Sequence, residues 1–287
     1  MGKRQKFILI LLISLVFCVC LGAVLYPLLS NYYAERHQTR VRTEYNAAIE
    51  EVRDDWAAIR EAAQRYNHQL ASGVMTGDQI LDLPTYDALL DPSGTGVMGY
   101  VIIPKLDVEL PIYHGDTNAA LDDGTAHLLG TSLPIGGEST HAVISGHTGM
   151  ASQRMFTDLD TLAVGDTFYL DVLGDRLTYE VDQILTVLPH EVEAIRIVEG
   201  GDFVTLLTCT PYGVNSHRLL VRGCRIEAEA PSAEPQTNAS EEKPTSTWLL
   251  QYWRGIRIGL SILAVILVLL LLGRLVYRKI RGTRHDR

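Results

Sequence analysis

Hydrophobic and polar residues divide the chain into uncharged, helical and alternating stretches. Residues 7–29 (FILILLISLVFCVCLGAVLYPLL) form a run of 23 positions without a charged side chain, and residues 258–272 (IGLSILAVILVLLLL) carry no charge either. A helix of about 20 apolar residues is long enough to cross the hydrocarbon core of a membrane. We therefore expect a cytoplasmic tail and anchor over 1–30 and a second transmembrane helix over 249–273. A cleaved signal peptide is the alternative for the first run, although its apolar region is typically only about 7–15 residues long.

Residues 31–70 place their apolar positions at the spacing of a helix. Val52, Trp56, Ile59 and Ala63 are separated by steps of three or four, and the segment contains neither Gly nor Pro. Side chains at these steps lie on one helical face. The pattern predicts an amphipathic helix, or a pair of helices, that forms a stalk. Residues 71–95 then lose the period, and a loop of this length is unusual unless it is a lid, a linker or disordered.

From residue 96 onward, short runs rich in β-branched and aromatic residues are separated by Pro, Gly and Asp. This is the pattern of strands and turns. We expect a mainly β domain over 96–229, a barrel or a sandwich, with short helices at 118–122 and 155–162. Residues 230–248 are rich in Pro, Ser, Thr and Glu and read as a linker. The expected strands are 97–103, 108–113, 141–146, 167–172, 177–187, 203–208 and 218–226.

The distribution of charge orients the chain and narrows its partners. Three basic residues precede the first uncharged run, and six follow the second over 274–287. By the positive-inside rule both ends are cytoplasmic and the middle is extracellular. The net charge is −9, and the two ends contribute +3 (1–30) and +7 (249–287), so residues 31–248 carry −19. An acidic domain argues against a nucleic-acid partner, because it has no excess of cations to replace phosphate counterions.

Composition favours a folded domain without a disulfide scaffold. Hydrophobic residues make up 47% of the chain and charged residues 21%, with a mean hydropathy of +0.09. Only Cys209 and Cys224 lie outside the first uncharged run. A disulfide framework would use more cysteines than two. The sequence leaves open whether Cys209 and Cys224 form a disulfide bond.

Two of the expected strands end in residues that can do chemistry. The segment TLLTC ends in Cys209, HAVISGHTG contains the Gly-flanked His147, and Arg218 begins the next strand. A thiolate can attack a carbonyl, an imidazole can give a proton to the leaving amine, and a guanidinium can stabilise the oxyanion. Taken singly, each residue is more often a packed thiol, a turn histidine or a surface charge. Spacing alone leaves the two readings evenly balanced.

The literal sequence around these residues resembles the signature of sortases, the cysteine transpeptidases of Gram-positive cell surfaces. The family motif is a TLxTC strand with a downstream arginine and an upstream histidine, matched here by TLLTC, Arg218 and GHTG. Residues 96–115, 124–149 and 155–189 extend the resemblance to class C, the pilus-assembling sortases. The resemblance implies a closed sortase-type β-barrel of about eight strands, with a transmembrane helix at each end and neither a metal nor an organic cofactor.

The resemblance also implies residue roles and partners. Cys209 would be the nucleophile, His147 the general acid and base, and Arg218 the stabiliser of the oxyanion. The substrates would be pilin or surface proteins with an LPxTG-like signal, cleaved between Thr and Gly to give a thioester on Cys209. The acceptor would be an amine, most often a pilin lysine. Candidate substrate contacts beside the motif are Thr208, Asn215 and Ser216.

Class C enzymes usually carry a lid with an Asp-Pro-aromatic motif, and this sequence departs from it. Asp91-Pro92 is followed by Ser93 and lies close to the first expected strand. We therefore expect a lid-like segment without the standard aromatic plug. Its candidate residues are Asp82, Tyr86, Asp91 and Pro92.

The remaining residues near the motif receive structural interpretations. We interpret Cys224 as a buried core thiol and His217 as a structural residue that points away from Arg218. Arg222, four residues after Arg218, is a lesser candidate for the stabilising role. The other histidines show no spacing suggestive of a metal site.

Three alternatives to a pilus polymerase remain at this point. The chain could anchor surface proteins to cell-wall peptide instead, or it could hydrolyse the thioester and release proteins to water. From another class, it could be an anchored surface adhesin without catalysis. An adhesin would need an LPxTG-like motif shortly before Trp248, and residues 241–248 (EEKPTSTW) contain none.

Overall fold

The computed structural model describes residues 3–73, 86–148 and 155–227, together with residues 256, 257, 259 and 261. The chain divides into two units, Met1–Lys243 and Pro244–Arg287. The four described residues of the second unit are helical. Nearly all of the expected transmembrane helix over 249–273, the linker over 230–248 and the tail over 274–287 lie outside the described residues. The architecture that follows belongs to the first unit.

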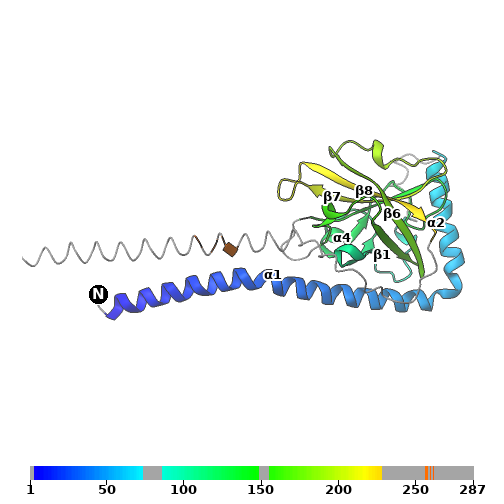
Figure 1. Ribbon diagram of the computed structural model, residues 1–287. Coiled ribbons are helices and arrows are strands. Elements are labelled where there is room, and N and C mark those ends of the chain that lie inside the picture. The colour runs from blue at the N-terminus through cyan, green and yellow to red at the C-terminus, as the bar shows by residue number, and fades with distance from the viewer. Residues whose placement is uncertain are drawn as a thin grey trace, which may run out of the picture. The chain divides into compact units, whose positions relative to one another are not determined.

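Eight strands close into a barrel, which confirms the predicted fold (Figure 1). The order around the barrel is β1-β2-β3-β4-β7-β8-β6-β5, and β5 pairs with β1 to close it. The pairs β2–β3 and β4–β7 are parallel, and the others are antiparallel. The strands are β1 (Val97–Ile103), β2 (Val108–Tyr113), β3 (Thr125–His127), β4 (Thr140–Ser145), β5 (Thr167–Val172), β6 (Asp175–Val187), β7 (Asp202–Thr210) and β8 (His217–Ile226).

Two details of the barrel differ from the sequence prediction. β3 was not predicted, because three residues are too few to show an alternating pattern. The helix expected at 155–162 is instead a turn followed by the 3-10 helix η4 (Leu159–Thr161). The other short helices are α4 (Asn118–Asp123), η2 (Tyr86–Ala88), η3 (Pro104–Leu106) and η5 (Glu193–Ile195).

Apolar side chains from every side of the barrel meet in one hydrophobic core. The Phe168 ring of β5 stacks on the Tyr179 ring of β6, with centroids 5.6 Å apart. A Cβ at Gly223 of β8 would lie 2.6 Å from the Phe168 ring, so only glycine fits under the stacked pair. Helical residues such as Tyr45 and Tyr66 belong to the same core. The helices before the barrel are therefore part of the folded domain.

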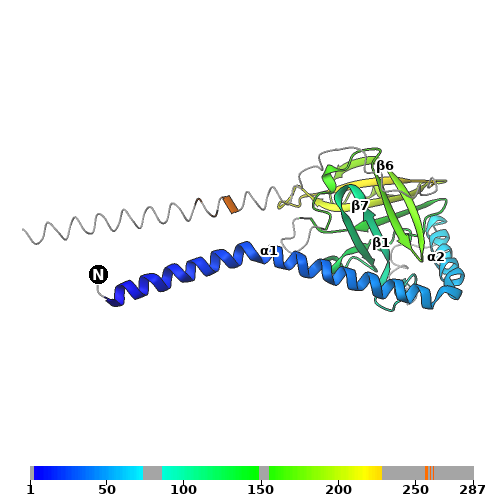
Figure 2. The same ribbon diagram turned by 60° about the horizontal axis from the view of Figure 1, so that its bottom comes forward.

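Those helices are α1 (Lys3–Glu51), η1 (Arg53–Asp55) and α2 (Trp56–Ala71). The helical conformation predicted over 31–70 is confirmed, with a break at Val52–Asp55 where the chain changes direction (Figure 2). The predicted boundary near residue 30 is not a structural break, because α1 runs through it. Within the described residues, no helix combines the length and apolar character needed to cross a membrane.

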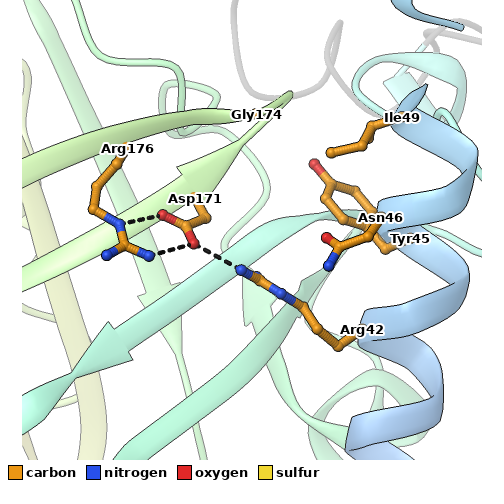
Figure 3. A pocket seen from close by; sticks show the side chains of 7 residues that line it. All are labelled: Arg42, Tyr45, Asn46, Ile49, Asp171, Gly174 and Arg176. Carbon is orange, nitrogen blue, oxygen red and sulfur yellow. Dashed lines mark hydrogen bonds and ion pairs between the residues drawn. The ribbon is translucent and has the colours of Figure 1, made fainter.

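The C-terminal part of α1 is fastened to the β5–β6 hairpin by charged and aromatic side chains (Figure 3). Asp171 accepts hydrogen bonds from Arg42 Nη2 (2.7 Å) and Arg176 Nε (2.8 Å). Burial alone would raise the pKa of Asp171, but the hydrogen bonds from the two arginines lower it. The hydroxyl of Tyr45 accepts from the N–H of Leu173 at 3.1 Å. This surface of the hairpin is therefore covered by α1.

A second contact fastens α2 to the loop between β3 and β4. The amide of Asn67 is 4% exposed and bonds both backbone groups of Leu133. Its Oδ1 accepts from the Leu133 N–H at 2.7 Å, and its Nδ2 donates to the Leu133 carbonyl at 3.1 Å. The Leu133 carbonyl also accepts from the Ile135 N–H at 2.8 Å, so it is the buried Leu133 N–H that depends on Asn67.

Candidate active site

The registers of three neighbouring strands bring Cys209, His147 and Arg218 to one end of the barrel. Cys209 lies directly opposite Arg218 in the antiparallel pair β7–β8. In the parallel pair β4–β7, Ser145 lies opposite Leu207, and the same register carried two residues further sets His147 beside Cys209. Directly opposed residues share one face of a sheet. The three candidate side chains therefore occupy neighbouring positions on one face.

That face is the outer face of the barrel. β7 turns Val204 and Leu206 into the core. Cys209 belongs to the alternate set of positions and is half-buried. The side chain of His147 is 36% exposed. Both reactive groups are thus accessible from solvent, as a nucleophile and its proton donor must be.

Backbone contacts on both sides of His147 fix its position against the cysteine strand. The N–H of Gly146 donates to the Leu207 carbonyl at 3.0 Å, and the N–H of Phe156 donates to the His147 carbonyl at 3.0 Å. The Thr208 hydroxyl donates to the Gly146 carbonyl at 2.7 Å. A Cβ at Gly146 would lie 2.7 Å from the Phe156 ring. Glycine is needed there because the ring packs directly on the backbone.

Arg218 is held by the turn that precedes it. Its Nη1 donates to the backbone carbonyls of Asn215 (3.2 Å) and His217 (3.1 Å). Asn215 adopts a left-handed conformation with φ 59°, and its N–H donates to the Pro211 carbonyl at 2.9 Å. A guanidinium in this place can stabilise negative charge on the oxygen of a carbonyl attacked by the Cys209 thiolate.

Sequence reasoning missed one charged neighbour of His147. Oδ1 of Asp122, in α4, lies 3.8 Å from Nε2 of His147. The helix itself was predicted, but the separation of 25 residues carries no sign of contact. The proximity arises because β3, which follows α4, pairs with β4, so that Ala126 lies opposite Ser145. Only the strand pairing reveals it.

The three candidate substrate contacts differ in their exposure to solvent. Thr208 is 3% exposed and donates its hydroxyl to Gly146, so we correct its predicted substrate contact to a structural role. Asn215 and Ser216 are exposed in the turn before Arg218. Their contact with a substrate stays a prediction.

Tyr86, predicted as part of the lid, is a core residue and not a cover over Cys209. It is 5% exposed, and its hydroxyl lies 2.7 Å from Nδ1 of His127 and accepts from the Gly115 N–H at 3.1 Å. Burial lowers the pKa of His127 to about 4, so its ring is neutral at pH 7. Nδ1 then accepts from Tyr86, while Nε2 donates to the Ser132 carbonyl at 2.9 Å. The two hydrogen bonds of its buried hydroxyl, to His127 and from Gly115, hold Tyr86 in place.

Of the other predicted lid residues, the structure describes Asp91 and Pro92. Asp82 lies outside the described residues. Asp91 and Pro92 form the turn that leads into β1, where the Asp91 carbonyl accepts from the Gly94 N–H at 3.4 Å.

Cys209 and Cys224 are both free, which decides the pairing that the sequence left open. Cys224 lies opposite Phe203, at the other end of the strand pair from Cys209. Its side chain is half-buried, so the prediction of a buried core thiol is wrong.

Arg222 donates to Asp182 from Nε (3.0 Å) and Nη2 (2.7 Å) and does not reach the site.

Within the described residues, neither a potential metal site nor the cleft beside α2 coincides with these residues. Over 3–73, 86–148 and 155–227 no group of three or more His, Cys, Asp or Glu side chains could hold a metal ion. A cleft of about 720 Å³ opens between α2 and the loop at 136–140. It lies at the opposite end of β4 and β7 from Cys209. The site rests instead on strand register.

Comparisons with known proteins agree with this geometry. The sequence profile of the sortase domain matches residues 101–226. The crystal structure of sortase C1 from Streptococcus agalactiae is 44% identical, with a TM-score of 0.62 over 66% of this chain and 100% of that one. Sortase C1 of GBS Pilus Island 1 is 40% identical, with a TM-score of 0.61 over 67% of this chain and 93% of that one.

Curated relatives are more distant. Sortase A of Streptococcus agalactiae is 32% identical over 118 residues, which are 40% of this chain and 47% of that protein. The chain thus spans about half the length of this curated relative. Similarity to a whole solved sortase C1, together with the matched sortase domain and the shared barrel, shows that this chain belongs to the sortase family, with class C enzymes as its structural neighbours.

Proposed function

We propose that this chain is a cysteine transpeptidase with Cys209 as its nucleophile. The observation that carries the proposal is the strand register, which sets His147 and Arg218 on either side of Cys209 on an accessible face. Thiol, imidazole and guanidinium are the three groups that acyl transfer through a thioester needs. Family membership supports the same assignment.

The reaction has two halves. The Cys209 sulfur attacks the carbonyl carbon of the scissile bond, and the guanidinium of Arg218 stabilises the oxyanion. The C–N bond then breaks as His147 gives a proton to the leaving amine, which leaves a thioester on Cys209. In the second half an incoming amine attacks the thioester and His147 takes a proton from it. The thiolate leaves, and a new amide bond remains.

The substrate class follows from the family and is proposed at that level. An LPxTG-like signal, cleaved between Thr and Gly, is the acyl donor, and a lysine of a pilin is the acceptor. Support for a pilin comes from the class C neighbours, one of which is named for a pilus island. Transfer to cell-wall peptide or to water would use the same thioester and differs only in the acceptor.

We propose the side of the membrane on which the barrel lies from the distribution of basic residues alone. Basic residues flank both uncharged runs on the side away from the barrel, which favours a barrel outside the cell with both termini in the cytoplasm. Protease treatment of intact cells tests it, since cleavage of the barrel but not of tags at the termini is expected.

Product analysis decides between the three acceptors. The full-length chain would be incubated with an LPxTG-type peptide, a lysine-containing pilin peptide and a cell-wall peptide amine in competition. A product in which the lysine side chain is joined to the Thr carbonyl is expected to dominate. Dominance of the wall-peptide product or of the free acid would replace the pilin acceptor with one of the alternatives.

A further inference from the structure

The short helix α4 delivers a carboxylate to the catalytic histidine. Thr117 caps its start, with Oγ1 accepting from the Ala120 N–H at 3.3 Å, and Gly124 ends it. Oδ1 of Asp122 lies 3.8 Å from Nε2 of His147. The Asp122 side chain is 64% exposed and the His147 side chain 36%.

The surroundings of His147 single out this carboxylate among the groups packed near the ring. β7 contributes Cys209 beside His147, and Arg218 of β8 lies beyond Cys209 on its other side. The segment that follows His147 contributes the Phe156 N–H to its carbonyl and carries Asp158 two residues on. Asp122 is the acidic partner for which the structure gives a contact with the imidazole.

The adjacent Asp123 belongs to a different environment. Burial first, and then the charge of Asp123 beside the ring, raise the pKa of Tyr113 to about 12. Asp123 is as exposed a carboxylate as Asp122 but acts on the tyrosine at the end of β2. The chain thus offers a matched control one residue away.

We propose that Asp122 is a positioning residue that holds Nε2 of His147, so that Nδ1 is the nitrogen that exchanges protons with the substrate amines. This inference rests on the proposed function of His147. A carboxylate near one ring nitrogen fixes the orientation of the ring and decides which nitrogen remains for proton transfer. Both halves of the reaction pass a proton through His147, so both depend on Asp122.

The solvent exposure of Asp122 and His147 sets the expected size of the rate loss. Attraction between partly exposed charges is weak because water screens it. Loss of the Asp122 charge is therefore expected to slow each half-reaction by about two- to fivefold. The fold should be unaffected, because an exposed carboxylate leaves no buried partner unsatisfied when it is replaced.

The test compares D122N, D122E and D123N in the full-length chain. The rate of thioester formation is measured without an amine, and the rate of aminolysis is measured from the preformed thioester, each across pH 5–9. In D122N both rates should fall by a similar factor across this pH range. D122E should recover most of the rate, and D123N should behave like the parent.

Alkylation of Cys209 by iodoacetamide, followed by peptide mass mapping, supplies a readout that needs no substrate. D122N should react more slowly than the parent and D123N should not, because in D122N the imidazole that takes the proton of the thiol is no longer held in place. A fall confined to aminolysis would overturn the positioning role and make Asp122 a contact of the incoming amine. Equal alkylation and equal rates in D122N and D123N would also overturn it. A parent that is alkylated but forms no thioester would refute the proposed function, while the alkylation comparison would still decide the role of Asp122.

Discussion

At the scale of residues, the site depends on which side chains are already committed to other partners. Arg218 and Arg222 are four positions apart on β8 and share a face. Arg222 is paired with Asp182 and lies over the ring of Phe203, 4.4 Å from its centroid. Arg218 donates to the backbone carbonyls of Asn215 and His217, and it lies opposite Cys209. The two arginines therefore have separate roles that the sequence could not distinguish.

Replacing each arginine with lysine should separate these roles. R218K removes the planar donor group beside Cys209, and thioester formation should slow by about 10²- to 10³-fold, the usual loss for an oxyanion donor. R222K should keep a rate near that of the parent, because its partners lie away from the thiol. Stopped-flow or quench measurements of acylation check both. Equal losses in the two variants would contradict the assignment.

The buried His127 predicts a pH dependence of stability. Its pKa is about 4 in the folded chain and about 6.5 when unfolded, so between these values the unfolded chain binds a proton that the folded chain does not. Its contribution is complete above pH 6.5 and is lost as the pH falls toward 4, by up to about 3 kcal/mol.

Urea unfolding of the parent and of H127Q between pH 4 and 7, followed by tryptophan fluorescence, measures this contribution. Glutamine is polar but does not titrate in this range. The free energy of unfolding should fall more steeply with acid in the parent than in the variant. Identical slopes would mean that His127 is not the group that titrates.

At the scale of elements, periodicity predicted the long elements and missed those made by pairing. The strands over 97–103, 108–113 and 167–172 match the structure residue for residue, because their runs of β-branched and aromatic residues extend over six or seven positions between turn residues. β3 has three residues and exists because it lies between β2 and β4. The contact of Asp122 with His147 depends on that unpredicted strand, which explains why the sequence did not indicate it.

A second prediction at the scale of elements concerns the contact between helix α2 and the barrel. N67A removes the side-chain acceptor of the buried Leu133 N–H and one of the two donors to the Leu133 carbonyl, and it should lower the free energy of unfolding by about 2 kcal/mol. N46A, at an exposed position on α1, should change it by less than about 0.5 kcal/mol. Chemical denaturation of both variants checks the difference. Equal stabilities would mean that α2 is not fastened through Asn67.

At the scale of the whole molecule, strand order matters more than any single motif. Cys209 and His147 are 62 positions apart in the chain. They meet because β4 and β7 pair in parallel, a connection that no local pattern specifies. The residues around TLLTC predicted the barrel only through their resemblance to a family. Composition and alternation alone left a barrel and a sandwich equally open.

The proposed reaction requires that Cys209 carries an acyl group between its two halves. The most direct measurement is intact-mass spectrometry of the full-length chain after incubation with an LPxTG-type peptide, with C209A and C224A as matched variants. The parent and C224A should each gain the mass of the acyl fragment ending in Thr, and hydroxylamine should remove it. C209A should gain nothing. An adduct that persists in C209A, or one that is lost in C224A instead, would contradict the account.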